Sequence, residues 1–160
     1  FRGSVTTKDF LHDANIWLAQ VPNPYVNATK RQPKNLGIHN GFNDYLFYDD
    51  DVDDDGTVKQ KYNAIEDEVA EIMSRHPGYK LYITGHSLGA ALSSLFAFMI
   101  SAREDIPKPV TCVSVASPFV GDGRWKRAFQ FAESIGNLRY LRISNKRDLV
   151  TIVPFLSFRL

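Results

Sequence analysis

A serine between two glycines is the residue in this chain with the clearest capacity for chemistry. Gly85, Ser87 and Gly89 fill the pattern Gly-x-Ser-x-Gly. In this pattern the serine sits on a tight turn between a strand and a helix, with its hydroxyl exposed for attack on a carbonyl carbon. A serine hydroxyl is a weak nucleophile until a base takes its proton, and the reaction also needs donors for the oxyanion that forms. We therefore predict acyl transfer through Ser87.

The segments on both sides of Ser87 are those that such a turn requires. Tyr79 to Thr84 is a short run rich in aromatic and β-branched residues, which predicts a buried strand. From Leu88 to Ile100 the apolar residues recur at helical spacing. The two glycines lack the side chains that would keep the helix from folding back against the strand. The sequence therefore predicts a nucleophile elbow, with Ser87 at the carboxyl end of a sheet.

Two backbone amides are candidates for an oxyanion hole. The Leu88 amide directly follows Ser87 at the start of the helix, where the elbow geometry aims it at the developing charge. A second donor is expected from a loop that follows an earlier strand. We interpret Phe1 to Ser4 as the end of a strand entering a loop, so the Ser4 amide is the second candidate.

The acid that orients the base is expected after a later strand. Asp148 lies just past the strand predicted for Leu138 to Ser144, in a polar turn. Asp122 is the competing carboxylate, but its place before a helix that begins near Gly123 favours a capping role. Spacing alone leaves Asp148 as either the triad acid or an ordinary turn residue.

The base is missing from the place where it is expected. The triad of this architecture runs along the chain in the order serine, acid, histidine. All four histidines of the chain precede Asp148: they are His12, His39, His76 and His86. We therefore expect the catalytic histidine beyond Leu160.

The remaining elements alternate between strands and helices. We expect a strand from Ile16 to Val21, helices over Val58–His76 and Trp125–Ile135, and a buried strand from Val110 to Ala116. Alternation of this kind, with near-continuous apolar strands, predicts an α/β fold with a mostly parallel central sheet flanked by helices.

The composition argues against several classes of function. The 160 residues are 44% hydrophobic, which supports one core, and a net charge of +1 favours neither nucleic acid nor an anionic membrane as a partner. No apolar run is long enough to span a bilayer. Cys112 is the only cysteine, and its apolar, strand-like surroundings predict packing in the core rather than nucleophilic chemistry.

A run of aspartates is the one strongly biased segment. Asp51 to Gly56 matches the first half of a calcium-binding loop, with aspartate at its first, third and fifth positions. The match then fails, because Tyr62 stands at the twelfth position, where a bidentate glutamate is required. We therefore interpret Asp49 to Asp55 as a solvated surface insertion, with calcium binding as the alternative.

Four separated motifs resemble those of the class-three (fungal-type) lipases of the α/β-hydrolase fold, in that family's order. Phe1 to Ser4 looks like the oxyanion motif, and His39 to Phe42 looks like the His-x-Gly-Phe segment of the family. Gly85 to Ala91 matches the elbow, including the histidine and leucine beside the serine. Asn145 to Val150 resembles the segment with the triad aspartate, and this favours Asp148 as the acid.

The chain departs from the family pattern at two places. Phe119 follows Pro118, where the family usually has arginine, so the loop around it is expected to be rearranged. Thr151 stands where the family often has proline. Because the resemblance covers nearly the whole chain, residues 1–160 are expected to form a partial α/β-hydrolase domain, without the first strands and the C-terminal segment that bears the histidine.

The resemblance implies a serine hydrolase that cleaves carboxylic esters of lipids, such as triacylglycerol or other glycerolipids, with no metal or organic cofactor. A phospholipase or another carboxylesterase has the same motifs, and a non-catalytic lipase-like binding or signalling module is the rival from another class. The implied partner is a lipid ester, in some cases at a lipid–water interface, which fits a secreted or lipid-associated protein. Val5 to Leu11 stands where the family has a lid, with packing into the core as the alternative.

Overall fold

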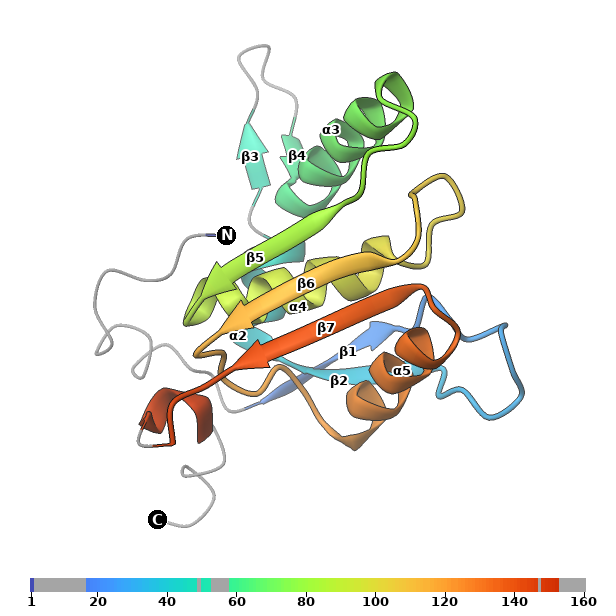
Figure 1. Ribbon diagram of the computed structural model, residues 1–160. Helices are drawn as coiled ribbons and strands as arrows, with labels where there is room; N and C mark the ends of the chain where they lie inside the picture. Colours follow the sequence, from blue (N-terminus) through green and yellow to red (C-terminus); the bar gives the residue numbers. More distant parts are fainter. Residues whose placement is uncertain (2–16, 49, 53–57, 147, 153–160) are drawn as a thin grey trace.

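Three parallel strands form the sheet that carries Ser87 (Figure 1). The computed structural model describes residues 1, 17–48, 50–52, 58–146 and 148–152. Strands β5 (Tyr82–His86), β6 (Val110–Val115) and β7 (Leu138–Ile143) lie in that order, and both strand pairs are parallel. Helix α4 (Leu88–Ile100) connects β5 to β6, and α5 (Gly123–Ser134) connects β6 to β7. This alternation confirms the predicted α/β class.

Helix α4 lies at the centre of the core. Its residues from Gly89 to Phe98 are all buried, and so is Ile100. Two buried serines of this helix donate to the Ala90 carbonyl, at 2.9 Å from Ser93 and 2.7 Å from Ser94. Because these hydroxyls have partners, the helix can lie against β5 and β6 without leaving a buried polar group unsatisfied there.

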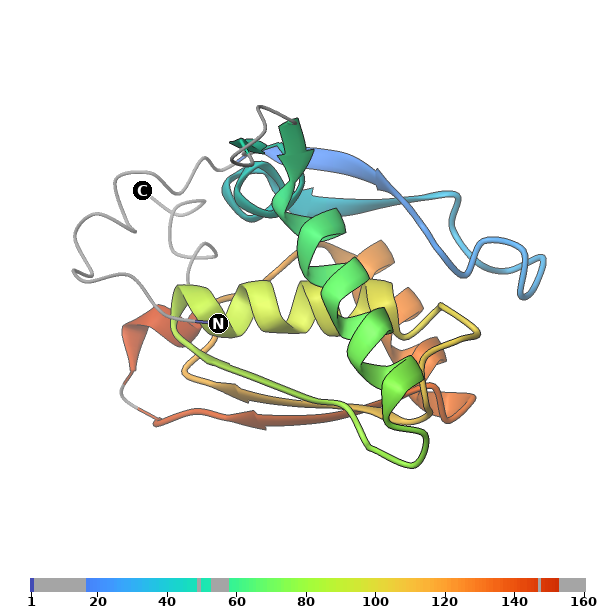
Figure 2. The same cartoon turned by 90° about the horizontal axis from the view of Figure 1, so that it is seen from above.

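The connecting helices cover one face of the sheet. Figure 2 shows α4 and α5 on the same side of the three strands, as right-handed crossovers in one direction require. The opposite face includes Tyr82, Leu141 and Ile143, whose exposed fractions are 66%, 54% and 48%. Parallel sheets usually bury both faces. The sequence predicts helices on both sides of the sheet. Within the described residues, helices cover only one of its faces.

The first described strands form a separate antiparallel hairpin. Strand β1 (Leu18–Pro22) pairs with β2 (Asn35–His39), and α2 (Asn40–Phe47) follows directly. The strand predicted to stop at Pro22 is confirmed, whereas β2 does not appear in the prediction. Asn and Gly, which both occur in β2, have low strand propensity, so its strand conformation depends on pairing with β1.

A second hairpin corrects the start of the long helix. Strands β3 (Asp50–Val52) and β4 (Val58–Gln60) pair antiparallel, and α3 then runs from Lys61 to Arg75. The helix expected from Val58 therefore begins at Lys61, because the three residues before it pair with β3. Asp53 to Gly56, which complete the calcium-like segment, lie outside the described residues.

The β1–β2 hairpin is bonded to the segment that follows β6. Ile38 forms an antiparallel bridge with Gly121, and the His39 amide donates to the Val120 carbonyl at 2.9 Å. The two backbones are so close that a Cβ on Gly121 would overlap the Gly37 carbonyl. These contacts hold the segment between β6 and α5 in one place beside the sheet.

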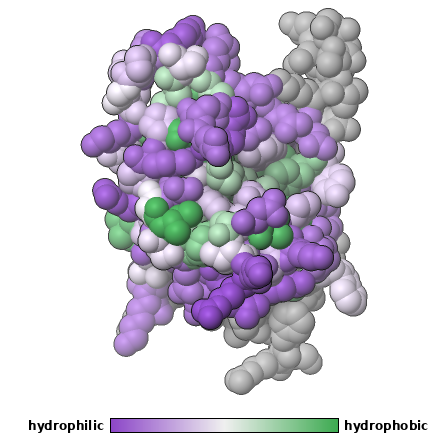
Figure 3. All heavy atoms as spheres, turned by 90° about the vertical axis from the view of Figure 1, so that its right-hand side faces the viewer, coloured by the Kyte–Doolittle hydropathy of each residue, from purple (hydrophilic) through white to green (hydrophobic). Residues whose placement is uncertain are grey.

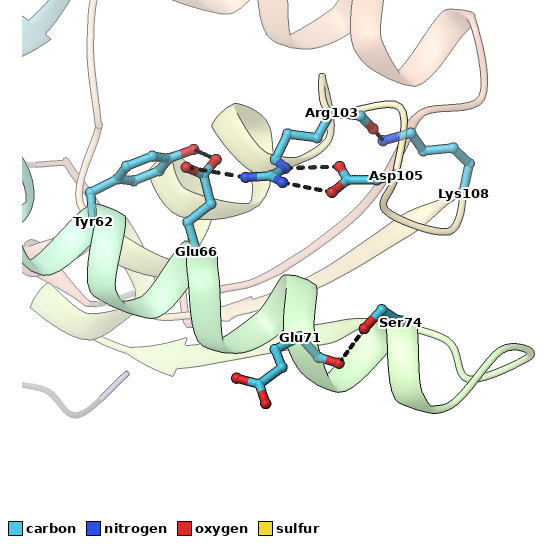
Figure 4. A network of polar contacts seen from close by, with 7 residues as sticks. All are labelled: Tyr62, Glu66, Glu71, Ser74, Arg103, Asp105 and Lys108. Atoms are coloured by element: carbon cyan, nitrogen blue, oxygen red, sulfur yellow. Dashed lines mark hydrogen bonds and ion pairs between the residues drawn. The ribbon is translucent and has the colours of Figure 1, made fainter.

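A polar network joins α3 to the turn after α4 (Figure 4). The Tyr62 hydroxyl donates to one oxygen of Glu66 at 2.7 Å, and Arg103 lies 3.4 Å from the other. Arg103 also donates to both oxygens of Asp105, at 2.8 and 2.6 Å. Burial raises the pKa of the Tyr62 hydroxyl, and its bond to Glu66 raises that pKa further. The network therefore holds the C-terminal end of α4, the helix that begins directly after Ser87.

The end of the molecule away from the carboxyl ends of the parallel strands is mostly hydrophilic. Figure 3 shows this end, where hydrophobic side chains are scattered among polar and charged ones. No helix in the described ranges is long and apolar enough to cross a membrane. The candidate chemistry lies at the opposite end, where β5, β6 and β7 finish.

Candidate active site

Ser87 occupies a one-residue turn between β5 and α4. Its backbone angles are φ 55° and ψ −124°, in a region that residues other than glycine rarely adopt. The Ser87 amide donates to the Val115 carbonyl at 3.0 Å, and the Ser87 carbonyl accepts from the Ala90 amide at 3.0 Å. These bonds hold Ser87 in its strained conformation, which is the geometry expected of a nucleophile elbow.

Close packing of backbone explains the first glycine of the motif. A Cβ placed on Gly85 would overlap the Gly89 carbonyl and would lie 2.8 Å from the Ala90 nitrogen. Helix α4 therefore crosses β5 at a distance that only glycine permits at this position. This confirms the role that the sequence predicts for Gly85.

The start of α4 offers hydrogen-bond donors next to Ser87. The side chain of Ser87 is half-buried and does not cap the helix. Leu88 is the first residue of α4, so its amide has no acceptor four residues earlier within the helix. The helix dipole adds partial positive charge at the same end. The arrangement can stabilise negative charge that develops beside the Ser87 hydroxyl.

Phe1 lies beside β5, where it contacts a residue just before the elbow. Its backbone nitrogen donates to the Thr84 carbonyl at 2.8 Å, and its ring lies 5.7 Å from that of Phe96. Ser4, the second predicted oxyanion donor, lies outside the described residues. The segment Val5 to Leu11, a candidate lid, also lies outside them.

Asp148 lies at the start of a short 3-10 helix, η1 (Leu149–Ile152), beyond the end of β7. One carboxylate oxygen, Oδ1, accepts from the Val150 amide at 3.0 Å. The Asp148 carbonyl accepts from the Thr151 hydroxyl at 2.7 Å. The side chain is half-buried, and its second oxygen can accept from another donor, which is what an acid that orients an imidazole needs.

The sheet brings Ser87 and Asp148 to the same end, separated by one strand. Ser87 follows β5 and Asp148 comes after β7, with β6 between them. Two strand spacings amount to roughly 10 Å. Ala116, at the end of β6, is a small residue with φ 53°. A histidine above the end of β6 could therefore reach both Ser87 and Asp148.

The described histidines have other surroundings. The ring of His76 stacks on Tyr79 at 4.7 Å, and the ring of His39 meets Phe42 edge-on at 6.2 Å. Burial lowers the pKa of His39, against the opposing effect of the Asp122 charge. His86 is exposed at the end of β5, and His12 lies outside the described residues. None of the described contacts joins a histidine to Ser87 or Asp148.

Two of the other candidate residues have the roles that the sequence predicts. Asp122 caps α5, because Oδ1 of its carboxylate accepts from the Arg124 and Trp125 amides at 2.9 and 3.1 Å. Cys112 is fully buried, and burial raises the pKa of its thiol to about 11. Within the described residues, no three His, Cys, Asp or Glu side chains gather as metal ligands.

Arg142, on β7, makes contacts that cannot be read from the sequence. Its guanidinium donates to the Ser117 carbonyl at 2.7 Å and to the Thr151 carbonyl at 2.9 Å. It also lies over the Phe119 ring, 5.0 Å from the centroid. Arg142 pairs in register with the buried Ser114 but is itself exposed, so its residue type gives no sequence signal for these contacts.

A groove of about 610 Å³ lies along α5 and β7. Its lining is mainly apolar and includes Phe119, Trp125, Phe129 and Tyr140, with Arg142 at its wall. Neither Ser87 nor Asp148 lines this groove, so it is separate from the candidate active site.

Comparison with known proteins gives the family of the chain. A sequence model of the class 3 lipases matches residues 1–158. The chain is 44% identical over 112 residues to phospholipase A1-II 3 of Oryza sativa subsp. japonica, and this alignment covers 62% of the chain and 26% of that protein. It is 29% identical over 170 residues to the chloroplastic galactolipase DONGLE of Arabidopsis thaliana, covering 99% of the chain and 33% of that protein.

The fold has solved counterparts. The structure matches the triacylglyceride lipase of Rhizomucor miehei with a TM-score of 0.68 and 24% identity, over 99% of this chain and 51% of that one. The chain thus spans between about a quarter and a half of these proteins. Because the family model extends over residues 1–158, the chain belongs to the class 3 lipase family and has its α/β-hydrolase fold.

Proposed function

We propose that the protein to which this chain belongs is a serine hydrolase that cleaves carboxylic esters of lipids. The observation that carries the proposal is the backbone of Ser87, held at φ 55° between β5 and the first turn of α4. A strained conformation persists only where the surrounding structure holds it, and such positions are concentrated at functional sites. A half-buried serine hydroxyl beside helix amides that have no acceptor within the helix is the arrangement that acyl transfer requires.

In the proposed reaction, the Ser87 hydroxyl attacks the ester carbonyl while a histidine takes its proton. The Leu88 and Ser4 amides hold the resulting oxyanion, and Asp148 orients the histidine and stabilises its charged form. Collapse of the tetrahedral intermediate breaks the ester bond, and the histidine gives its proton to the leaving alcohol. Water then attacks the acyl-enzyme by the same steps in reverse, which releases the fatty acid and restores Ser87. We propose that the histidine lies beyond Leu160.

The relatives support a substrate class for the proposed reaction. The sequence relatives are named for phospholipids and galactolipids, and the structural neighbour is named for triacylglycerides. An acyl ester of a glycerolipid is the bond that these three substrate classes share. The sequence relatives named for polar glycerolipids, phospholipase A1-II 3 among them, favour a glycerolipid with a polar head group. Such substrates are presented at a lipid–water interface.

The direct test is covalent labelling of the full-length protein with a fluorophosphonate probe. We expect labelling of the unaltered protein and of a control that replaces the exposed Ser134 by alanine (Ser134→Ala), and none of Ser87→Ala. Persistent labelling of Ser87→Ala would contradict the proposal. Hydrolysis of phospholipid, galactolipid and triacylglycerol dispersions by the same three proteins then identifies the substrate. Binding to all dispersions without any release of fatty acid would point to a lipase-like binding module instead.

A further inference from the structure

We propose that Arg142 is a positioning residue that holds Asp148 in place through the backbone of η1. This inference rests on the proposed function, because it concerns the acid of the proposed triad. Arg142 does not contact the Asp148 carboxylate in any described interaction. It acts on the turn that carries Asp148, and on the segment after β6 that faces this turn.

One guanidinium nitrogen of Arg142 joins two segments of the chain. Its Nη2 atom donates to the Ser117 carbonyl at 2.7 Å and to the Thr151 carbonyl at 2.9 Å. Ser117 follows β6, and Thr151 belongs to η1. Both segments lie at the end of the sheet where Ser87 is found. Loss of these two bonds would leave the η1 turn without this link to β6.

The bond to Thr151 is transmitted to Asp148 within a single turn. Thr151 is buried, with an exposed fraction of 8%. Its hydroxyl donates to the Asp148 carbonyl at 2.7 Å, and its amide donates to the same carbonyl at 3.3 Å. The Val150 amide in turn donates to the Asp148 carboxylate. A shift of Thr151 therefore moves the backbone and the side chain of Asp148 together.

The bond to Ser117 gives the turn a fixed reference. Ser117 is 1% exposed, and its hydroxyl donates to the Pro118 carbonyl at 2.8 Å. Two residues earlier, the Val115 carbonyl accepts from the Ser87 amide at 3.0 Å. The segment that receives Arg142 is thus the one that holds the elbow. Through it, Arg142 sets the position of Asp148 relative to Ser87.

The shape of the arginine side chain suits this role. Its planar guanidinium lies over the Phe119 ring, 5.0 Å from the centroid. Stacking on a ring while donating at the edge is a geometry that lysine cannot reproduce. Phe119 also occupies the position where the sequence departs from the family pattern. Here it forms one side of the support for Arg142.

The test is a double-mutant cycle in the full-length protein, with kcat and KM measured separately. We expect Arg142→Met to lower kcat by about tenfold to a hundredfold, as misplacement of a catalytic group by about 1 Å does. KM should change by less than about threefold, because no substrate contact is removed. Arg142→Lys should recover part of the loss. Arg139→Met, on the same strand but on the opposite face of the sheet, is the matched control and should keep its kcat.

The cycle separates positioning from a purely structural role. Asp148→Asn should lower kcat by about 10⁴-fold. If Arg142 acts through Asp148, adding Arg142→Met to Asp148→Asn changes kcat by less than about twofold. If the two losses multiply instead, the inference is wrong, because Arg142 then acts independently of the acid. An unchanged kcat for Arg142→Met would also overturn the inference about Arg142. If Ser87→Ala is inactive in the same assay, the proposed function still holds. Full activity of Ser87→Ala would overturn both.

Discussion

The Ser87 amide donates to the Val115 carbonyl at 3.0 Å, so the strained residue of the elbow is bonded to the end of the neighbouring strand. The conformation of Ser87 is therefore a property of two strands and a helix together. A residue with φ 55° would otherwise relax, because this region costs of the order of 1–3 kcal/mol for any residue other than glycine.

Replacement of Ser87 should reveal this strain. Ser87→Gly removes both the hydroxyl and the steric conflict of the side chain, whereas Ser87→Ala removes only the hydroxyl. We expect Ser87→Gly to have a free energy of unfolding about 1 kcal/mol higher than that of Ser87→Ala. Urea unfolding of the two variants measures the difference. Equal stabilities would mean that the turn is not strained.

A methyl group at Gly85 should displace α4 from the sheet. The added Cβ would overlap the Gly89 carbonyl, and backbone cannot move aside cheaply. We expect Gly85→Ala to lower the free energy of unfolding by about 3 kcal/mol and to abolish probe labelling of Ser87. Gly123→Ala is the control, because nothing lies within 4 Å of its added Cβ, and it should be neutral or slightly stabilising. A stable, labelled Gly85→Ala protein would contradict the packing described above.

The cap of α5 should make stability depend on acid. Burial alone would raise the pKa of Asp122, but hydrogen bonds from the Arg124 side chain and two backbone amides together hold that pKa below its ordinary value of 3.8. A lowered pKa in the folded state adds stability above pH 3.8, and this stability is lost as the pH falls through the folded pKa.

We therefore expect Asp122→Ala to lower the free energy of unfolding by about 1–2 kcal/mol at pH 7. Asp122→Asn keeps an acceptor for the cap and should cost less. The gap between the unaltered protein and Asp122→Asn should shrink below about pH 4, because the carboxylate becomes protonated. Chemical unfolding at pH 7 and pH 3 gives the free energies of unfolding of these proteins. A difference between the unaltered protein and Asp122→Asn that is larger at pH 3 than at pH 7 would contradict the prediction.

The buried thiol should affect stability at alkaline pH. The pKa of Cys112 is raised from 9.0 to about 11, so above pH 9 the unfolded chain releases this proton before the folded protein does. The unfolded state is favoured as the pH rises from 9 to 11, by up to about 3 kcal/mol from this group. Cys112→Ala should lose that part of the pH dependence, and the difference between the two unfolding curves isolates it. Rapid alkylation of the native thiol at pH 8 would show that Cys112 is accessible.

Local patterns were sufficient for the elbow and its neighbours. The strand before Ser87, α4, β6 and α5 each have an apolar period that a single element can satisfy by itself, and the structure confirms them. Asp122 could be assigned to a cap because capping depends on the next few residues only. Apolar periodicity and helix capping both depend on residues close together in the chain, so they can be predicted from the sequence.

Strands that lack an apolar pattern of their own, and that form only by pairing with a partner strand, were not predicted. Strand β2 contains Gly37 and pairs with β1 across a long loop, and β4 pairs with β3 across the acidic run. Val58 continues the apolar spacing of α3, which explains why the helix was expected to start there. The contacts of Arg142 join two carbonyls from separate segments, and no residue pattern reports such a convergence. Ser4 and the histidine stay predictions.

The end of β6 has a consequence for how this protein can vary in sequence. The Val115 carbonyl accepts from the Ser87 amide, and the Ala116 amide donates to the Ile143 carbonyl at 2.8 Å. The Ser117 carbonyl accepts from the guanidinium of Arg142. All three contacts use backbone atoms of consecutive residues, so a change of side chain can leave them in place. An insertion or deletion of one residue would shift the whole set out of register. A change in the length of this segment is therefore more disruptive during divergence than the loss of any one of its side-chain contacts.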